Sequence, residues 1–290
     1  MNNKFQGTGV ALVTPFTKDG AIDYPALAKL VEHVIENKVD FLVALGTTAE
    51  TPTLSTEEKQ AVLRFVIQQN NKRVPLVCGA GGNNTAAVIQ QLQTWDWNGV
   101  DGLLSVVPYY NKPTQEGIYQ HYAAIVKASP LPVILYNVPA RTGSSVAIET
   151  SLRLAKDFKN IIAMKDASAG LEQCKGLVNG GFAVTSGDDA LALDMIKLGA
   201  VGLISVIANA YPKEVVAIVD AALEGDFNAA QEAHNHLTPV MNVAFDDGNP
   251  SSIKYFLHKQ GLIENTLRLP LVPVKKESAE RIEKVFTSFK

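Results

Sequence analysis

The sequence predicts an α/β fold: a closed (β/α)8 TIM barrel followed by a C-terminal helical region. The main observation is the alternation of eight short, continuously apolar runs with longer amphipathic ones over about 225 residues. Continuous apolar runs are typical of parallel strands that are covered on both faces. After residue 225 the strand pattern stops and only helical patterns follow. We therefore expect a catalytic barrel over residues 1–225 and a helical region over residues 226–290.

The expected elements follow one another in the order that a barrel needs. Helical patterns at 24–37, 55–69 and 147–158 separate the apolar runs, and later ones lie at 225–245, 250–260 and 277–289. Asp23 precedes the first helix, and "STEE" offers Ser55 or Thr56 as an N-cap with a Glu about three residues on. The eight expected strands are 9–16, 41–46, 74–81, 101–108, 131–139, 160–168, 182–189 and 201–209.

An open, doubly wound sheet is the main alternative. Its dinucleotide fingerprint needs a third glycine, and "GAGGNN" at 79–84 has Asn84 in that place. The stretch is better explained as a glycine-rich turn between a strand and a helix, so the barrel is favoured.

Composition excludes several classes of function. The chain has 290 residues, a net charge of -3 and 47% hydrophobic residues, which indicates a globular protein without a basic surface for nucleic acid. No apolar run has the length of a membrane span, and "MNNKFQGTG" has no apolar signal-peptide core. Two cysteines make a disulfide framework improbable, and the five histidines show no metal-ligand spacing. We expect a cytoplasmic protein with no metal.

Lys165 is the first candidate for chemistry, because it ends the apolar run "NIIAMK". In a barrel the active site lies at the carboxyl ends of the strands. One interpretation is a lysine that reaches solvent or pairs with Asp166 or Asp188. The other is a Schiff-base lysine, whose neutral amine condenses with a ketone or 2-oxo acid to form an imine. This chemistry needs no metal or organic cofactor.

Other strand-end residues could complete such a site. Tyr136 ends the preceding strand, and neighbouring strands lie about 4.8 Å apart, so its hydroxyl can reach Lys165. Thr47 and Thr48 in "LGTTAET" offer hydroxyls and backbone N–H groups to a carboxylate. Arg141 has the planar fork that suits a second carboxylate. Taken singly, Tyr136 is better explained as a buried aromatic with a satisfied hydroxyl, and Arg141 can be explained as a surface loop charge.

Six motifs in order resemble a known family: "GTTAET", "VPYYNKPTQEG", "YNVPARTG", "IIAMKDAS", "TSGDD" and "GLISV". Together they resemble the pyruvate-dependent class I aldolases, the family that includes dihydrodipicolinate synthase and N-acetylneuraminate lyase. The resemblance covers essentially the whole chain, and "GTT", "PYYN" and "NVPART" are most similar to the dihydrodipicolinate synthase branch. It implies that pyruvate forms an imine on Lys165 and then attacks L-aspartate 4-semialdehyde, in the diaminopimelate route to lysine.

The resemblance also implies a proton relay. Tyr136, Thr47 and Tyr110 would move protons during imine formation and cyclisation. In the family, the tyrosine that matches Tyr110 comes from the adjacent subunit, and the usual assembly is a tetramer built as a dimer of dimers. We therefore expect a homotetramer.

The remaining site residues follow from the same resemblance. Thr48 together with Thr47 would hold the pyruvate carboxylate, and Arg141 would bind the carboxylate of the aldehyde substrate. The backbone carbonyls of Gly187 and Ile204 would border the site.

Some family members are inhibited by lysine, which binds in a cleft at the dimer interface. Those members tend to have a histidine in place of Lys59 and a glutamate in place of Ala87. A positive side chain and a missing carboxylate both disfavour a lysine ammonium, so we expect weak or absent inhibition. The residues that match this cleft are Thr51, Pro52, Thr56, Lys59, Asn83, Ala87 and Tyr109.

Two alternatives remain open. One keeps the imine chemistry but uses another acceptor, as in an N-acetylneuraminate or 2-keto-3-deoxy acid lyase; Arg141 disfavours a simple sugar. The other is a non-catalytic sensor of 2-oxo acids, which has no need of a complete relay. Replacement of Lys165 by alanine separates the sensor from an aldolase, because a sensor could still bind its ligand.

Overall fold

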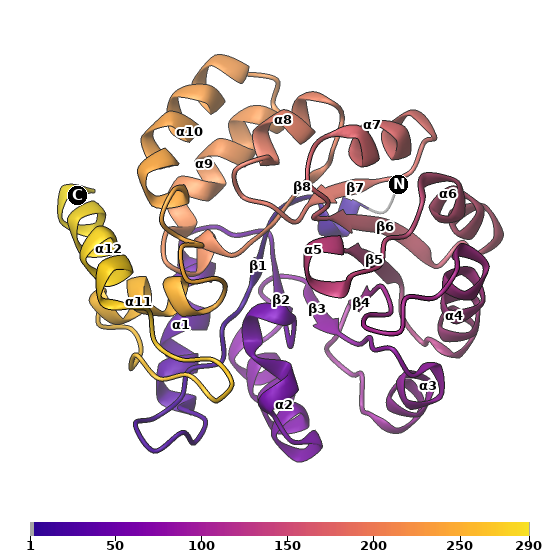
Figure 1. The fold of residues 1–290 in the computed structure, drawn as a ribbon, viewed down its shortest axis with the longest axis horizontal. Coiled ribbons are helices and arrows are strands. Elements are labelled where there is room, and N and C mark those ends of the chain that lie inside the picture. Colours follow the sequence, from indigo (N-terminus) through magenta and orange to yellow (C-terminus); the bar gives the residue numbers. More distant parts are fainter. Residues whose placement is uncertain (1–2, 290) are drawn as a thin grey trace.

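The computed structural model describes residues 3–289 and confirms the closed barrel. Eight parallel strands follow one another around it in chain order, and β1 pairs with both β2 and β8 (Figure 1). Seven of the eight predicted apolar runs contain a whole strand, and the run at 9–16 overlaps β1. The strands are β1 (Gly7–Ala11), β2 (Phe41–Ala44), β3 (Leu76–Gly79), β4 (Gly102–Val106), β5 (Val133–Asn137), β6 (Ile161–Asp166), β7 (Val184–Ser186) and β8 (Gly202–Ser205).

The first strand differs from its expected bounds of 9–16. It begins at Gly7 and ends at Ala11, although residues 12–16 are also buried. The Val13 backbone N–H donates to the Asn209 side chain instead of to a neighbouring strand, and Pro15 has no N–H group to resume the ladder, so the segment continues as a buried loop. Burial alone therefore overestimated the length of this strand.

Helices surround the barrel and carry the expected caps. The Asp23 side chain accepts a hydrogen bond from the Ala26 backbone N–H, and Ser55, rather than Thr56, forms a capping box with Glu58. The helices between and after the strands are α1 (Tyr24–Glu36), α2 (Thr56–Asn70), α3 (Thr85–Thr94), α4 (Gln115–Ala128), α5 (Pro139–Thr142), α6 (Ile148–Asp157), α7 (Glu172–Asn179), α8 (Ala192–Lys197) and α9 (Pro212–Leu223).

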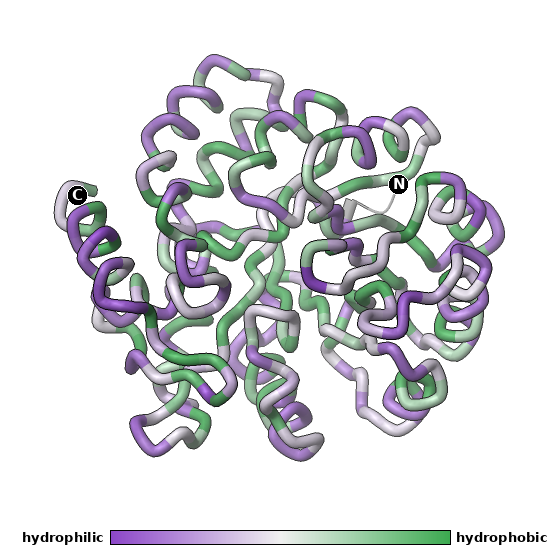
Figure 2. The backbone as a smooth tube through the Cα atoms, in the orientation of Figure 1, coloured by the Kyte–Doolittle hydropathy of each residue, from purple (hydrophilic) through white to green (hydrophobic). Residues whose placement is uncertain are grey.

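Apolar residues form two layers. One fills the barrel and includes Phe41, Ile134, Tyr136 and Ile204, and the other lies between the strands and the surrounding helices. Figure 2 shows the apolar positions along the central strands and the polar ones on the outer helices. Because side chains alternate along a strand, the inward position of Tyr136 makes its register partner Lys165 an inward residue too.

Three further helices follow the barrel: α10 (Phe227–Met241), α11 (Ser251–Lys259) and α12 (Lys276–Ser288). Helix α10 packs on α9 and α8, and α11 lies near the loops at the barrel mouth (Figure 1). The separation of residues 226–290 as a region of their own stays a prediction. Among the helices of residues 3–289, none combines the length and the apolar content that crossing a bilayer needs.

Candidate active site

Lys165 and Tyr136 lie side by side at the carboxyl ends of β6 and β5. They are register partners in the parallel ladder, and the Lys165 Nζ atom lies 4.5 Å from the centre of the Tyr136 ring. Both side chains are buried, with Lys165 only 5% exposed. The predicted neighbourhood of the two residues is confirmed.

The Lys165 amine has no anionic partner within residues 3–289. The Asp166 carboxylate accepts hydrogen bonds from the backbone N–H and the hydroxyl of Ser168, and burial raises the pKa of this carboxyl group. Asp188 accepts a hydrogen bond from the Ala190 backbone N–H. The interpretation of Lys165 as a solvated or ion-paired lysine is therefore wrong. The amine is instead held inside the barrel, beside the Tyr136 ring.

Gly187 gives Lys165 the space that it occupies. A Cβ atom at this position would lie 2.9 Å from the Lys165 Cε atom and 2.8 Å from the Ala167 Cβ atom. The Gly187 backbone N–H donates to the Asp166 carbonyl, which fixes the turn after β7 beside the lysine. Ile204, fully buried, lies in the same interior layer as Tyr136.

Asp189 ties the turns after β7 and β8 together. Its carboxylate accepts hydrogen bonds from the Ser205 hydroxyl and the Val206 backbone N–H, and burial raises its pKa to about 6. The Asp189 side chain therefore has a structural role, because its hydrogen bonds join the two turns. Among residues 3–289, no cluster of three or more His, Cys, Asp or Glu side chains could hold a metal ion.

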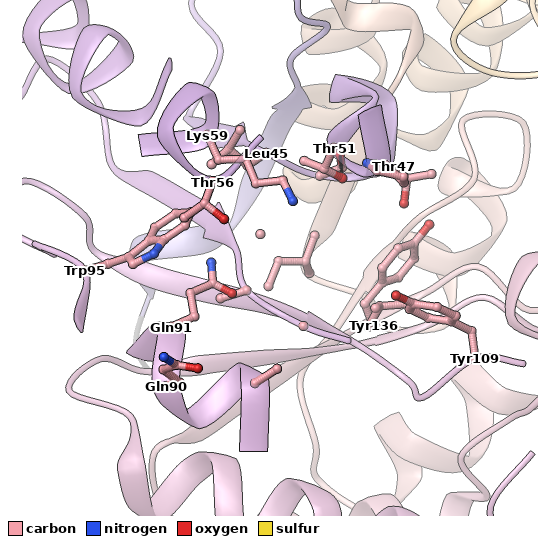
Figure 3. Close-up of a pocket in the computed structure, with 18 of the residues that line it drawn as sticks. Leu45, Thr47, Thr51, Thr56, Lys59, Gln90, Gln91, Trp95, Tyr109 and Tyr136 are labelled. Carbon is pink, nitrogen blue, oxygen red and sulfur yellow. Dashed lines mark hydrogen bonds between the residues drawn. The ribbon is translucent and has the colours of Figure 1, made fainter. Parts of the chain in front are cut away.

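A cavity of about 480 Å³ opens at the barrel mouth. Thr47 and Tyr136 line one end, where Figure 3 shows the Tyr136 hydroxyl directed toward Thr47 and Tyr109 beside it. Lys59 and Gln91 extend into the other end, which runs between α2 and α3. The structure therefore places two of the four expected catalytic residues, Thr47 and Tyr136, along the same cavity as most of the expected inhibitor cleft, whereas Lys165 and Tyr110 are not among its lining residues.

Six of the seven expected cleft residues line this cavity, and one does not. Asn83 lies outside the lining, and its side-chain amide donates to the Tyr109 carbonyl. Trp95 lines the far end, although its sequence position gave no sign of this. The six lining residues are Thr51, Pro52, Thr56, Lys59, Ala87 and Tyr109.

Tyr109 and Tyr110 are the exposed aromatic pair of the loop after β4. Tyr109 is 41% exposed and Tyr110 is 86% exposed. Tyr110 has a positive φ of 72°, which is uncommon for a bulky side chain, and its backbone N–H donates to the Thr142 carbonyl. Tyr110 does not line the cavity of its own chain.

Thr48 and Arg141, the residues expected to bind the two carboxylates, both contact Asn249, which the sequence did not suggest as a site residue. The Asn249 Nδ2 atom lies 2.9 Å from the Thr48 Oγ1 atom, to which it donates. The Asn249 carbonyl accepts a hydrogen bond from the Arg141 Nη2 atom at 3.3 Å. Thr48 is buried and Arg141 is exposed on the short helix α5.

A buried ion pair supports the loop that carries both threonines. The Lys254 Nζ atom lies 2.5 Å from the Glu50 Oε1 atom, and both side chains are fully buried. Lys254 also donates to the Thr266 carbonyl and lies 4.2 Å from the centre of the Phe16 ring. Glu50 has a left-handed backbone conformation directly after the short 3-10 helix Thr47–Ala49. The pair therefore anchors the end of this loop to α11.

Arg268 extends the same network toward α2. Its backbone N–H donates to the Glu50 Oε2 atom, and its guanidinium forms a two-pronged ion pair with Glu58. These hydrogen bonds lower the pKa of Glu58 to about 2. The segments of Glu58, Lys254 and Arg268, which are far apart in the sequence, thus hold the loop that Glu50 ends.

Comparisons with known proteins point to one family. The model of the dihydrodipicolinate synthetase family matches residues 4–288. The 4-hydroxy-tetrahydrodipicolinate synthase of Azobacteroides pseudotrichonymphae is 51% identical over 288 residues, which are 98% of this chain and 97% of that protein. Among solved structures, the chloride-inhibited dihydrodipicolinate synthase of Acinetobacter baumannii, complexed with pyruvate, has a TM-score of 0.95 at 43% identity and 98% coverage of both chains. A monomeric dihydrodipicolinate synthase variant has a TM-score of 0.95 at 37% identity, covering 99% of this chain and 97% of its own.

Proposed function

We propose, because this chain belongs to the dihydrodipicolinate synthetase family, that it condenses pyruvate with L-aspartate 4-semialdehyde through an imine on Lys165. The expected enzyme class is confirmed: the family consists of lyases, and relatives 51% and 49% identical over nearly their whole length are 4-hydroxy-tetrahydrodipicolinate synthases. The observation that carries the proposal is the buried amine of Lys165, which lies beside the Tyr136 ring and has no anionic partner among the residues that the structure describes. We expect the reaction to take place in the cytoplasm.

The chemistry begins when the Lys165 amine attacks the keto carbon of pyruvate. Loss of water gives a protonated imine, which withdraws electrons from the neighbouring methyl carbon. Loss of a methyl proton then gives an enamine, whose carbon bonds to the aldehyde carbon of the second substrate. Finally, the amino group of that substrate attacks the imine carbon, closes the ring and releases Lys165. No external cofactor takes part in these steps.

Tyr136 and Thr47 are suited to move the protons. Both hydroxyls border one end of the cavity, and a hydroxyl can donate and accept a proton at the same time. Tyr110 is exposed in its own chain, which supports the proposal that it completes the relay of an adjacent subunit. The proposed assembly is therefore a homotetramer built from dimers, in which each dimer has two complete sites.

Two groups are suited to the two carboxylates. Thr48 is a buried hydroxyl on the loop after β2 and would bind pyruvate together with the backbone of that loop. Arg141 is exposed next to the same mouth and would bind the carboxylate of the aldehyde. The carbonyls of Gly187 and Ile204 would border the reacting atoms.

The first experiment measures turnover of pyruvate with L-aspartate 4-semialdehyde through a coupled reductase. Lys165→Ala should abolish turnover, and the exposed Lys156→Ala on α6 is the matched control. Borohydride in the presence of pyruvate should add a reduced pyruvyl group to the wild type and not to Lys165→Ala. Trapping without turnover would move the assignment to a lyase with another aldehyde acceptor. Pyruvate binding that survives in Lys165→Ala without any turnover of the wild type would indicate a sensor.

A further inference from the structure

A second pair of register partners follows Tyr136 and Lys165 at the ends of β5 and β6. Asn137 and Asp166 are paired in the same parallel ladder, and each is the next residue in its strand. Because side chains alternate along a strand, both point away from the barrel interior, toward the surrounding helices. They are nevertheless almost inaccessible, with Asn137 0% and Asp166 1% exposed. A buried amide and a buried carboxylate therefore lie on the outer face of the two strand ends.

Both side chains are bound through one oxygen atom. The Asn137 Oδ1 atom accepts hydrogen bonds from the Val146 backbone N–H at 3.2 Å and from the Ser145 hydroxyl at 3.3 Å. The Asp166 Oδ1 atom accepts from the Ser168 backbone N–H at 3.1 Å and from the Ser168 hydroxyl at 2.7 Å. The two side chains thus bind the segment between α5 and α6 and the turn after β6.

The other polar atom of each side chain is buried and has no partner within residues 3–289. These atoms are the Asn137 Nδ2 donor and the Asp166 Oδ2 acceptor. An unpaired buried polar atom is costly, and here the donor and the acceptor belong to register partners on one face. Burial raises the pKa of Asp166, and Ser168 together with the nearby Asn137 amide offsets part of this rise. A small rotation of the two side chains would pair the donor with the acceptor.

The backbones of these two residues hold the same strand ends. The Asn137 carbonyl accepts a hydrogen bond from the Ala167 N–H at 2.8 Å, and the Asp166 carbonyl accepts one from the Gly187 N–H at 2.7 Å. Gly187 is the residue that gives Lys165 its space. A shift of Asn137 or Asp166 would therefore move the catalytic side chains, and a misplacement of about 1 Å can cost roughly 10²-fold in rate.

We propose that Asn137 and Asp166 form a buried amide–carboxylate pair that positions Tyr136 and Lys165 for imine formation. The inference rests on the proposed function and extends it to two positioning residues that do not line the cavity. The pair would act only through the strand ends, because its side chains lie on the face opposite to the reacting atoms.

The test measures imine formation on Lys165, which requires no second substrate. Enzyme is mixed with saturating pyruvate and quenched with borohydride at increasing times, and the reduced adduct is measured by mass spectrometry. Asp166→Asn should lower the rate roughly tenfold or more. The Ser168 backbone N–H and the Asn137 amide are both donors, so either orientation of the new amide sets a donor against a donor.

The double variant Asn137→Asp, Asp166→Asn exchanges the two groups and can keep every hydrogen bond. Position 137 would still accept from Val146 and Ser145, position 166 would still accept from Ser168, and the contact between them would run in the opposite direction. The double variant should therefore recover most of the rate that Asp166→Asn loses. Asn137→Asp alone sets two carboxylates against each other and should be slow, so the four proteins form a double-mutant cycle.

Asn70→Asp is the matched control. Asn70 is also buried, and its amide donates to the Val74 carbonyl at 2.7 Å on α2, away from the strand ends. It should lower the Tm and leave the rate of imine formation unchanged.

The outcomes separate this inference from the proposed function. If Asp166→Asn does not fold, the double variant alone decides, because it should fold and form the imine at nearly the wild-type rate. An unchanged rate in Asp166→Asn, or a double variant that is slow or unfolded, would overturn the inference while the wild-type imine stands. A wild type that forms no imine would overturn the proposed function and this inference together.

Discussion

The buried ion pair between Lys254 and Glu50 should be a principal support of the barrel mouth. Lys254→Met removes the charged amine and leaves a carboxylate that is fully buried. The Arg268 backbone N–H would remain as its donor, at 3.0 Å, but no positive charge would replace the one 2.5 Å away. Breaking a buried pair by removal of one partner costs about 3–5 kcal/mol.

The loss should be visible as a lower melting temperature. For a chain of this size, 1 kcal/mol corresponds to about 2 °C, so Lys254→Met should lower the apparent Tm by about 6–10 °C. The double variant Glu50→Gln, Lys254→Met leaves no unpaired charge and should recover most of that loss. Lys275→Met breaks an ion pair whose lysine is 79% exposed, and it should change the Tm by less than about 2 °C.

Differential scanning calorimetry or circular dichroism at one pH and scan rate measures these four proteins. Turnover at saturating substrates should be measured alongside, because the loop that Glu50 ends carries Thr47 and Thr48. A Lys254→Met variant that melts within 2 °C of the wild type, at the same temperature as Lys275→Met, would refute the reasoning. So would a double variant that is less stable than Lys254→Met alone.

Three further predictions concern the relay, the cavity and the acid limb of stability. Tyr110→Phe should lower kcat by roughly 10²-fold with little change in Tm, and hybrids with an inactive Lys165→Ala subunit should regain activity if Tyr110 acts in the neighbouring subunit. Lysine should inhibit weakly or not at all, because Lys59 is positive and Ala87 supplies no carboxylate; an inhibition constant in the micromolar range would contradict this. The pKa of Glu58 is lowered from 4.5 to about 2 in the folded protein, so its contribution is present above pH 4.5 and is lost as the pH falls toward 2. Glu58→Gln should therefore flatten the fall in Tm over that range, and an unchanged pH profile would contradict the assignment.

The sequence predicted the barrel because its strands are buried on both faces. Such a strand is expected to be apolar along its length. A lysine at the end of "NIIAM" departs from this pattern and therefore indicates a functional residue. The adjacency of Lys165 and Tyr136 followed from the order of the strands alone, since consecutive strands of a parallel barrel are neighbours. Strand ends were less certain, as β1 shows, because a buried loop is as apolar as a strand.

The contacts of Asn249, Glu50 and Lys254 were not predictable in the same way. They join residues about 200 positions apart in the chain. Neither periodicity nor motif spacing indicates which loops contact one another at the mouth of a barrel. A lysine in a helical pattern is predicted to lie on the surface. Lys254 is fully buried instead, because it forms an ion pair with Glu50 and donates a hydrogen bond to the Thr266 carbonyl. Trp95 was missed for a related reason, since the cavity that it lines lies between two helices.

These contacts bear on how the chain should be divided. The hydropathy pattern changes near residue 225, which suggests a barrel with an appendage. An ion pair and two hydrogen bonds to the loop that carries Thr47 and Thr48 cross that line, because Lys254 and Arg268 bind Glu50 and Asn249 binds Thr48. A boundary in the sequence pattern marks where one kind of secondary structure ends, whereas a boundary in folding lies where few contacts cross. By the second criterion we infer that the C-terminal helices belong to the active site, because they fix the loop on which both substrates would depend.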